Sequence, residues 1–276
     1  MKDSLVSVAW LKEHWADPNL VILDASLHNN KSNLTSSYPD LQIKGARFFD
    51  LKKVFSNQAS SLPNMLPSPI DFSTKCCELG IHQSSKIVVY DNLGIYSSPR
   101  VWWMFKAMGH ANVAVLDGGL PAWVQEESAV EKRRKRFYSK GDFSANYQAT
   151  LICNAEDILK NIDQAQALVI DARSAERFKG LVPEPRKELA KGHIPKSINL
   201  PFQKVIQNGK LKSKKELREL IAPLIPNSSP VICSCGSGTT ACILLLAFAQ
   251  IITTPTALYD GSWSEWGSLK NAPIES

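Results

Sequence analysis

Short apolar runs alternate with longer amphipathic stretches along this chain of 276 residues. The runs are nearly continuous and rich in β-branched side chains, which is typical of parallel strands covered on both faces. The amphipathic stretches predict helices, and Ser7 and Ser213 are candidate N-caps for two of them. The expected strands are 20–24, 86–91, 113–117, 167–171, 230–235 and 256–260, and the expected helices include 7–15 and 213–224.

The two halves of the chain repeat this pattern in the same order. The first half contains "LVILDASLH", "IKGARFFDL", "KIVVYDNLG" and "VAVLDGGLPAW", and the second contains "ALVIDARSAERF", "IPKSINLPF", "PVICSCGSG" and "TALYDGSWSEW". Equivalent positions keep nearly constant spacing, which indicates a tandem duplication. We therefore expect an α/β protein of two similar domains, each with a central, mostly parallel sheet flanked by helices. The expected limits are 1–126 and 148–276, joined by a basic connector at 127–147.

Composition and charge narrow the classes of function. The chain is 44% apolar and 21% charged, which suits a globular protein with a sizeable core. The N-terminus does not resemble a signal peptide, and the apolar run at 241–252 is too short to span a bilayer. We therefore expect a soluble, cytoplasmic protein with no membrane partner.

The net charge of +6 includes five consecutive basic residues at 132–136. Such a run can bind nucleic acid, but no aromatic-studded basic groove accompanies it. We expect a solvated linker and no nucleic-acid partner.

The six cysteines do not form the paired spacings of a zinc site, and nothing else in the sequence suggests a metal or an organic cofactor. Most of them are expected to be buried free thiols. Cys235 differs, because it ends a predicted strand and begins the loop "CGSGTTA" at 235–241. Loops at the carboxyl ends of parallel strands form the functional sites of such sheets.

The composition of this loop favours an anionic sulfur. Gly236 and Gly238 are expected to adopt backbone angles closed to other residues, so that amides can point inward. Thr239 or Thr240 is a candidate cap for a helix beginning near 241, and the hydroxyl of Ser237 adds a donor. The positive end of that helix would favour thiolate over thiol.

Three reaction classes use a loop of this kind. A cysteine phosphatase needs an arginine at the end of the loop, where this chain has alanine and cysteine. A nucleotide-binding P-loop needs Gly-Lys-Ser/Thr, and the lysine is missing. Sulfur transfer through a cysteine persulfide remains.

The sequence resembles the tandem-domain rhodanese family over nearly its whole length. The segments that carry the resemblance are "YSSPRVWWMFKAMGH" (96–110), "LDGGLPAW" (116–123), "PEPR" (183–186), "GHIP" (192–195), "CGSGTTA" (235–241) and "YDGSWSEWG" (259–267). The resemblance implies two rhodanese-like domains, of which the first is catalytically silent. Aligning the predicted strands places Asp91 where the second half has Cys235.

The resemblance also implies a site and a reaction. Cys235 would be the persulfide-forming nucleophile, assisted by Ser237, and Arg177 and Arg186 would bind the substrate carboxylate and ketone. Gly-Ser-Gly after the cysteine resembles members that use mercaptopyruvate, whereas members that use thiosulfate tend to have basic residues there. The implied acceptor is a thiol, such as thioredoxin or glutathione, or cyanide. Arg173 and His193 match family positions that we interpret as structural.

One departure from the family pattern affects the donor. Members that use mercaptopyruvate commonly have a histidine before "MLP" in the first domain, where this chain has Asn64, and an acidic residue where it has Lys52. Asn64 can donate a hydrogen bond but cannot relay a proton. Two alternatives therefore stay open: a thiosulfate sulfurtransferase, and a persulfide relay protein that is loaded by a partner.

Overall fold

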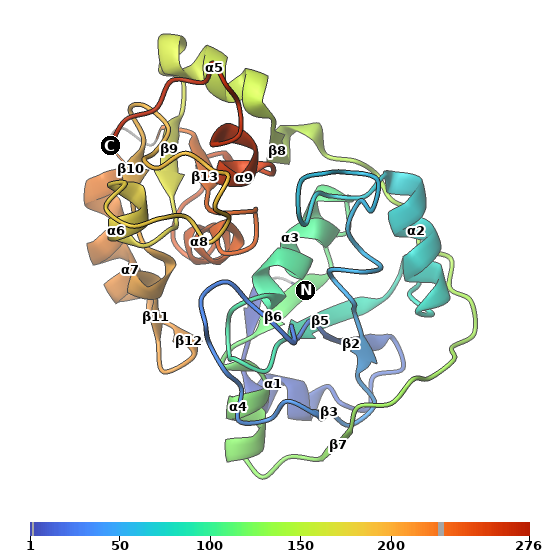
Figure 1. The fold of residues 1–276 in the computed structure, drawn as a ribbon. Coiled ribbons are helices and arrows are strands. Elements are labelled where there is room, and N and C mark those ends of the chain that lie inside the picture. Colours follow the sequence, from blue (N-terminus) through green and yellow to red (C-terminus); the bar gives the residue numbers. More distant parts are fainter. Residues whose placement is uncertain (2, 226–228) are drawn as a thin grey trace. The chain divides into compact units, whose positions relative to one another are not determined.

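The computed structural model describes residues 1, 3–225 and 229–276, and these divide into two compact units (Figure 1). Unit 1 comprises Met1–Gln58, Leu66–Gln148 and Asn208–Leu211. Unit 2 comprises Ala59–Met65, Ala149–Gln207 and Lys212–Ser276. Unit 2 thus includes a short segment from the first half of the sequence, and this segment contains Asn64.

A five-stranded sheet in the order β1-β6-β5-β2-β4 forms the centre of unit 1, and each of its neighbouring pairs is parallel. A separate antiparallel pair joins β3 to β7. The elements of unit 1 are β1 (Leu5–Val6), α1 (Val8–Glu13), β2 (Leu20–Asp24), β3 (Leu41–Ile43), β4 (Arg47–Phe48), α2 (Pro69–Glu78), β5 (Lys86–Tyr90), α3 (Ser98–Ala107), β6 (Val113–Leu116), α4 (Gly119–Gln125), β7 (Val130–Lys132) and β12 (Lys210–Leu211).

The sheet of unit 2 has the order β10-β9-β13-β14-β8 and is also parallel throughout. The elements of unit 2 are η1 (Ala149–Leu151), β8 (Ile152–Cys153), α5 (Ala155–Gln164), β9 (Leu168–Asp171), α6 (Ala175–Phe178), β10 (Ile198–Asn199), η2 (Phe202–Val205), β11 (Ile206–Gln207), α7 (Lys214–Ile221), η3 (Ala222–Leu224), β13 (Val231–Ser234), α8 (Ala241–Phe248), β14 (Thr256–Tyr259) and α9 (Ser262–Trp266).

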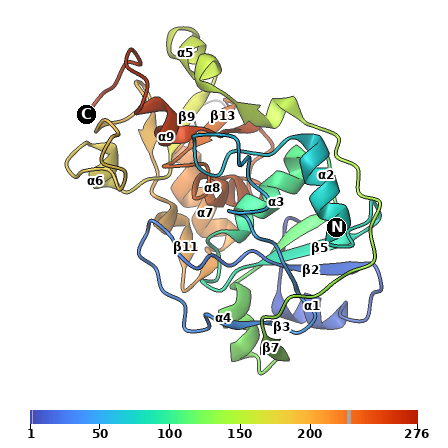
Figure 2. The same cartoon turned by 45° about the vertical axis from the view of Figure 1, so that its right-hand side comes forward.

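Each sheet is covered on both faces, which explains why its strands are apolar along their whole length. In unit 1, alternate side chains of the central strands join α1 and α4 in one cluster that includes Leu11 and Trp123. The side chains between them point to the opposite face, and α1 and α3 lie on opposite sides of β2 and β5 (Figure 2). In unit 2, α5 and α9 contribute Ile158, Trp263 and Trp266 to the cluster on one face.

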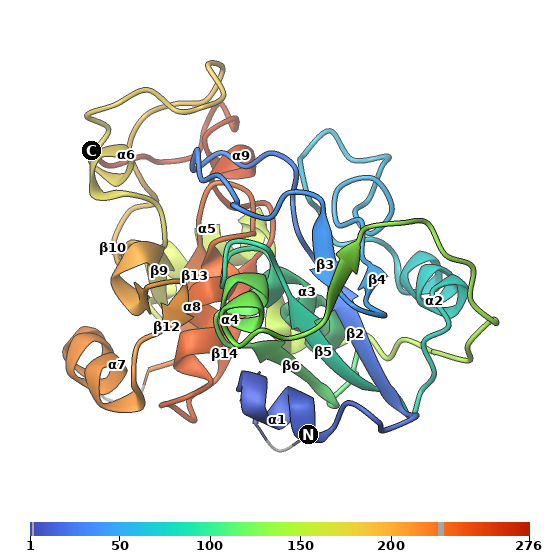
Figure 3. The same cartoon turned by 90° about the horizontal axis from the view of Figure 1, so that it is seen from below.

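The predicted strands and their parallel arrangement are confirmed, and Figure 3 shows β2, β5 and β6 of unit 1 side by side. Both predicted N-caps are confirmed as well. The side chain of Ser7 accepts a hydrogen bond from the backbone of Trp10, and Ser213 forms a capping box with Glu216. The helix that begins after Ser213 ends at Ile221 and continues as the short 3₁₀ helix η3.

The basic run differs from the solvated linker that we expected. Strand β7 includes Lys132, and Arg133 forms an ion pair of 2.7 Å with Asp24, whose side chain is fully buried. Arg136 pairs with Glu131. Part of the run is therefore bound to unit 1, because Asp24 lies in the core and needs a charged partner.

No helix among the described residues is long and apolar enough to cross a membrane.

Candidate active site

Cys235 follows directly after β13, at the carboxyl end of the sheet of unit 2. This position is the topological switch point, since the chain leads from β9 to β10 on one side and from β13 to β14 on the other. Cys235 is only 1% exposed. Helix α8 begins six residues later at Ala241, so its N-terminus closes the loop.

Four consecutive carbonyl groups of the loop, at positions 235–238, each accept a hydrogen bond. The donors are the backbone of Trp263 for position 235 (2.9 Å), the backbone and hydroxyl of Ser264 for position 236, the side-chain amide of Asn64 for position 237 (3.4 Å) and the thiol of Cys242 for position 238 (3.2 Å).

These bonds fix the direction of the loop amides. All peptide bonds of the described residues are trans. In a trans peptide the N–H points opposite to the carbonyl, so each N–H at 236–239 points away from the donor that bonds the carbonyl before it. An anion cradle is built from consecutive backbone amides that are directed in this way by their own peptide planes.

The two loop glycines have different roles. Gly238 has a φ of +73°, as expected, which favours glycine there. Gly236 does not need a positive φ, contrary to our expectation; a β-carbon there would lie 3.1 Å from the Nη2 atom of Arg177. Glycine at 236 therefore gives room to the guanidinium.

The predicted hydroxyl cap of α8 is wrong. Thr240 occupies the N-cap position, but its side chain makes no capping hydrogen bond to the described residues. The hydroxyl of Thr239 instead accepts a bond from Asn64 at 3.4 Å.

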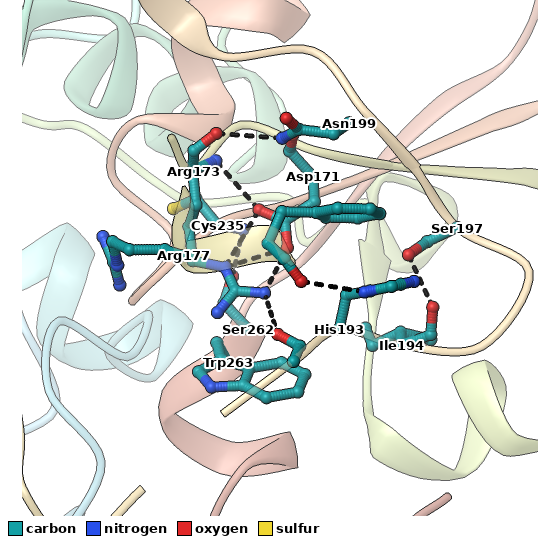
Figure 4. A network of polar contacts seen from close by, with 12 residues as sticks. Asp171, Arg173, Arg177, His193, Ile194, Ser197, Asn199, Cys235, Ser262 and Trp263 are labelled. Carbon is teal, nitrogen blue, oxygen red and sulfur yellow. Dashed lines mark hydrogen bonds and ion pairs between the residues drawn. The ribbon is translucent and has the colours of Figure 1, made fainter. Parts of the chain in front are cut away.

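Arg177 lies against the loop because Glu184 holds it. Glu184 is 5% exposed, and its carboxylate accepts hydrogen bonds from Nε and Nη2 of Arg177. The same carboxylate accepts a bond of 2.9 Å from Arg173, which also pairs with Asp171 and stacks over the ring of Trp263 at 4.2 Å (Figure 4). Arg173 is fully buried in this network, in agreement with the structural interpretation.

Arg186 reaches the loop through Ser264. Its Nη1 donates a bond of 2.9 Å to the hydroxyl of Ser264, and that hydroxyl donates to the carbonyl of Gly236. Burial lowers the pKa of Arg186, while the nearby charges of Glu188 and Cys235 raise it. Since the pKa of an arginine starts above 12, the guanidinium stays charged at neutral pH.

Asn64 lies at the loop as well. Its side-chain amide donates a bond of 3.0 Å to the hydroxyl of Ser237. A hydroxyl that accepts one bond keeps its own proton for another acceptor. Asn64 has a φ of +60°, a conformation that asparagine tolerates better than most residues.

The other thiols of unit 2 are less suited to chemistry. Cys233 is fully buried on the same strand, as expected, and burial raises its pKa well above the usual value. Burial also raises the pKa of Cys153 to about 11. All the cysteines are free thiols. His193 donates a hydrogen bond from Nδ1 to the carbonyl of Phe178 (2.8 Å) and stacks on its ring, which agrees with a structural role.

The equivalent loop of unit 1 carries a carboxylate where unit 2 has the thiol. The register pairs Tyr90 with Asp24 and Ser234 with Asp171, so Asp91 is the counterpart of Cys235. The Asp91 carboxylate is fully buried and accepts bonds from five donors: the backbone amides of Leu93, Tyr96, Ser97 and Ser98, and the hydroxyl of Ser98, at 2.7–3.0 Å. The cradle of unit 1 therefore already holds an anion that belongs to the chain itself.

Sequence reasoning missed several residues of this site, of which Glu184, Ser262 and Ser264 matter most. Ser262 is buried with a φ of +50°; its hydroxyl accepts from the backbone of Cys235 (3.2 Å) and donates to the carbonyl of Tyr259. The recurrence of "DGGLPAW" as "DGSWSEW" was the available signal for the two serines, because it places α9 beside the loop. Among the described residues, no group of three or more His, Cys, Asp or Glu could hold a metal ion.

Comparison with known proteins identifies the family. The model of the rhodanese-like domain matches residues 7–126 and 154–269, and the chain belongs to this family. It is 37% identical over 274 residues to the 3-mercaptopyruvate sulfurtransferase of Escherichia coli K12, covering 98% of this chain and 97% of that protein. It is 37% identical over 298 residues to the mitochondrial thiosulfate/3-mercaptopyruvate sulfurtransferase 1 of Arabidopsis thaliana, covering 99% of this chain and 78% of that protein.

The structure is similar to the crystal structure of SseA, a 3-mercaptopyruvate sulfotransferase from Escherichia coli. The TM-score is 0.83 at 35% identity, over 95% of this chain and 99% of that chain. Both the tandem arrangement and the rhodanese fold that the sequence predicted are thereby confirmed.

Proposed function

We propose that this protein transfers a sulfur atom from 3-mercaptopyruvate to a thiol acceptor through a persulfide on Cys235, releasing pyruvate. The observation that carries the proposal is the loop after β13, where the carbonyls at 235–238 are each hydrogen-bonded and each amide at 236–239 points away from the donor of the carbonyl before it. Amides and the N-terminus of α8 stabilise an anionic sulfur. The names of the relatives support mercaptopyruvate as the donor.

The first step forms the persulfide. The Cys235 thiolate attacks the sulfur of mercaptopyruvate, the carbon–sulfur bond breaks, and its electron pair leaves with the carbon as the enolate of pyruvate. Arg177 and Arg186 bind the carboxylate and the enolate oxygen, since both guanidinium groups lie at Gly236 or are joined to it through Ser264. Water then protonates the enolate carbon to give pyruvate.

Ser237 assists by hydrogen bonding alone. Its hydroxyl accepts from Asn64 and can donate its proton to the substrate oxygen as negative charge develops there. Asparagine cannot take up a proton at this position, so no proton relay runs through it.

The second step regenerates the enzyme. The thiolate of the acceptor attacks the outer sulfur of the persulfide, takes it up as a new persulfide, and leaves Cys235 as thiolate. We propose thioredoxin or glutathione as acceptor and the cytoplasm as location. We also propose that the first domain, 1–126, is catalytically silent because Asp91 replaces the nucleophile, and that the second domain, 148–276, carries the reaction.

The substitution Arg186→Ala tests the binding role. Losing a charged hydrogen bond costs about 1.5–3 kcal/mol, so the KM for mercaptopyruvate should rise about tenfold or more. Pyruvate release at varied mercaptopyruvate measures this, with Arg218→Ala, an exposed arginine of α7, as the control. An unchanged KM in Arg186→Ala would contradict the assignment.

A further inference from the structure

Unit 1 contains a cavity of about 430 Å³ at the carboxyl end of its own sheet. The loops that follow β2 and β5 line it, and these strands flank the topological switch point of unit 1 (Figure 1). Ligands of open α/β sheets bind at this position. The cavity therefore lies at the topological counterpart of the Cys235 loop, in a unit that has Asp91 in place of the cysteine.

The lining of the cavity is polar. Two thirds of its lining residues carry a side-chain amide, hydroxyl, imidazole or guanidinium group: His28, Asn29, Asn30, Asn33, Thr35, Ser36, Asn92 and Arg133. The apolar lining residues are Leu27, Leu34, Pro39 and Leu93. The loop uses Asn30 and Ser36 for its own structure, since Asn30 bonds the backbone of Ser32 and Leu34 and Ser36 bonds the carbonyl of Asn92.

Asn92 is the residue that points to a ligand. It is only 6% exposed, and its side-chain amide has no hydrogen-bond partner in the described part of the chain. Asn92 lines the cavity, and a polar group without a protein partner in such a place is satisfied by water or by a ligand. The unused amide of Asn33 lines the same cavity.

The positive charge at the cavity is balanced by a carboxylate. Arg133 is neutralised by Asp24, to which its Nε and Nη2 donate at 3.0 and 2.7 Å. The surroundings of Cys235 differ, because Arg173 and Arg177 both pair with Glu184, while Arg186 donates to the hydroxyl of Ser264 and not to a carboxylate. A site without net charge and lined by amides matches a neutral ligand with both donors and acceptors, rather than an anion.

We infer that this cavity is a second, non-catalytic binding site for a small uncharged molecule that carries amide or hydroxyl groups. It supports binding without chemistry, because the position of the nucleophile is occupied by Asp91, whose carboxylate is saturated by the donors of its own loop. This inference does not depend on the reaction proposed for unit 2.

Acetamide and acetate test the inference, because they have nearly the same shape and differ in charge. Each is titrated into the full-length, ¹⁵N-labelled protein at constant ionic strength, and the side-chain amide signals of Asn92 and Asn33 are followed. We expect saturable shifts with acetamide and none with acetate. Shifts with neither probe, or stronger binding of acetate, would overturn the proposal.

Two variants assign the shifts to the cavity. Asn92→Leu removes the buried amide at similar volume, and Asn33→Gly removes the second amide while keeping the φ of +54° accessible. Each should weaken acetamide binding at least severalfold while the spectrum stays that of a folded protein. Asn146→Ala, outside the cavity, is the control. If both cavity variants fold and bind acetamide like the wild type, the site is elsewhere and the proposal is wrong.

Discussion

Ser264 connects Arg186, the residue proposed to bind the substrate, to the loop that contains Cys235. Its hydroxyl accepts from Arg186 and donates to the carbonyl of Gly236, so one side chain orients the guanidinium and the peptide whose N–H follows at position 237. Its hydroxyl acts on Arg186 and on the loop. We therefore regard it as a positioning residue.

Replacing Ser264 by alanine should lower kcat/KM for mercaptopyruvate. Losing the hydrogen bonds costs about 1–2 kcal/mol, which corresponds to about 5- to 30-fold. Both kcat and KM should change, because the loop amides and Arg186 are affected together. Steady-state kinetics measure this, with Ser268→Ala as the matched control, since the hydroxyl of Ser268 bonds a carbonyl at the exposed end of α9. Rescue by Ser264→Thr would support the hydrogen bonds; equal kinetics in Ser264→Ala and the wild type would exclude the role.

We expect residue 64 to affect how the rate depends on pH, because its side chain bonds the hydroxyl of Ser237. A histidine at this position must be neutral to take a proton from Ser237, so its protonation lowers the rate as the pH falls through about 6.5. Asparagine does not titrate. We expect the pH profile of Asn64→His to gain a limb near this pH that the wild type lacks. Measuring kcat between pH 5.5 and 8 compares the two; identical profiles would mean that residue 64 does not act on Ser237.

The residues of the site differ in how far sequence could reveal them. Cys235 and its loop were predictable because a thiol, glycines and hydroxyls crowd into seven adjacent positions. Glu184 was not, since a glutamate in a loop usually lies on the surface. Its role depends on Arg173 and Arg177, which both form ion pairs with it in the folded chain. A single sequence does not show such contacts.

At the scale of elements, the loop after β5 is built around Asp91. Four backbone amides and one hydroxyl converge on this carboxylate, and two of them belong to Ser98, the first residue of α3. Burial raises the pKa of Asp91, and the same hydrogen bonds lower it. The carboxylate therefore joins the strand to the start of the helix.

Asp91→Ala should destabilise unit 1. It leaves five buried donors without an acceptor, and since one unsatisfied group costs about 1–3 kcal/mol, we expect a loss of at least about 3 kcal/mol. Urea unfolding followed by tryptophan fluorescence, to which Trp102 and Trp103 on α3 contribute, measures the change. Asp3→Ala, at an exposed position of the same unit, is the control. If Asp91→Ala is as stable as the control, the carboxylate does not hold the loop.

The strands and helices could be predicted from the pattern of apolar and polar residues in the sequence. The unbroken apolar strands predicted two parallel sheets, and the register confirmed the alignment of Asp91 with Cys235. The basic run was interpreted wrongly, because nothing near Arg133 in sequence indicates the buried Asp24 that it pairs with. Contacts between distant segments, rather than local propensity, account for that difference.

At the scale of the whole molecule, each of the two duplicated domains has a topological switch point in its sheet, and different residues occupy the two positions. One carries a thiol with two arginines, and the other carries a self-satisfied carboxylate beside a neutral polar cavity. The segment Ala59–Met65 shows that the repeat is not exact, since it precedes most of unit 1 in sequence but belongs to unit 2. It brings Asn64 to Ser237, a contact across more than a hundred residues that the repeat pattern does not predict.

The persulfide on Cys235 is the central claim, and intact mass spectrometry tests it most directly. The reduced protein is exposed briefly to mercaptopyruvate, with thiosulfate in a parallel sample and Cys235→Ser as the control for both. We predict a gain of one sulfur atom with mercaptopyruvate in the wild type and no gain in Cys235→Ser. A gain only with thiosulfate would contradict the proposed donor, and a gain with neither, or one that persists in Cys235→Ser, would contradict the proposed nucleophilic reaction itself.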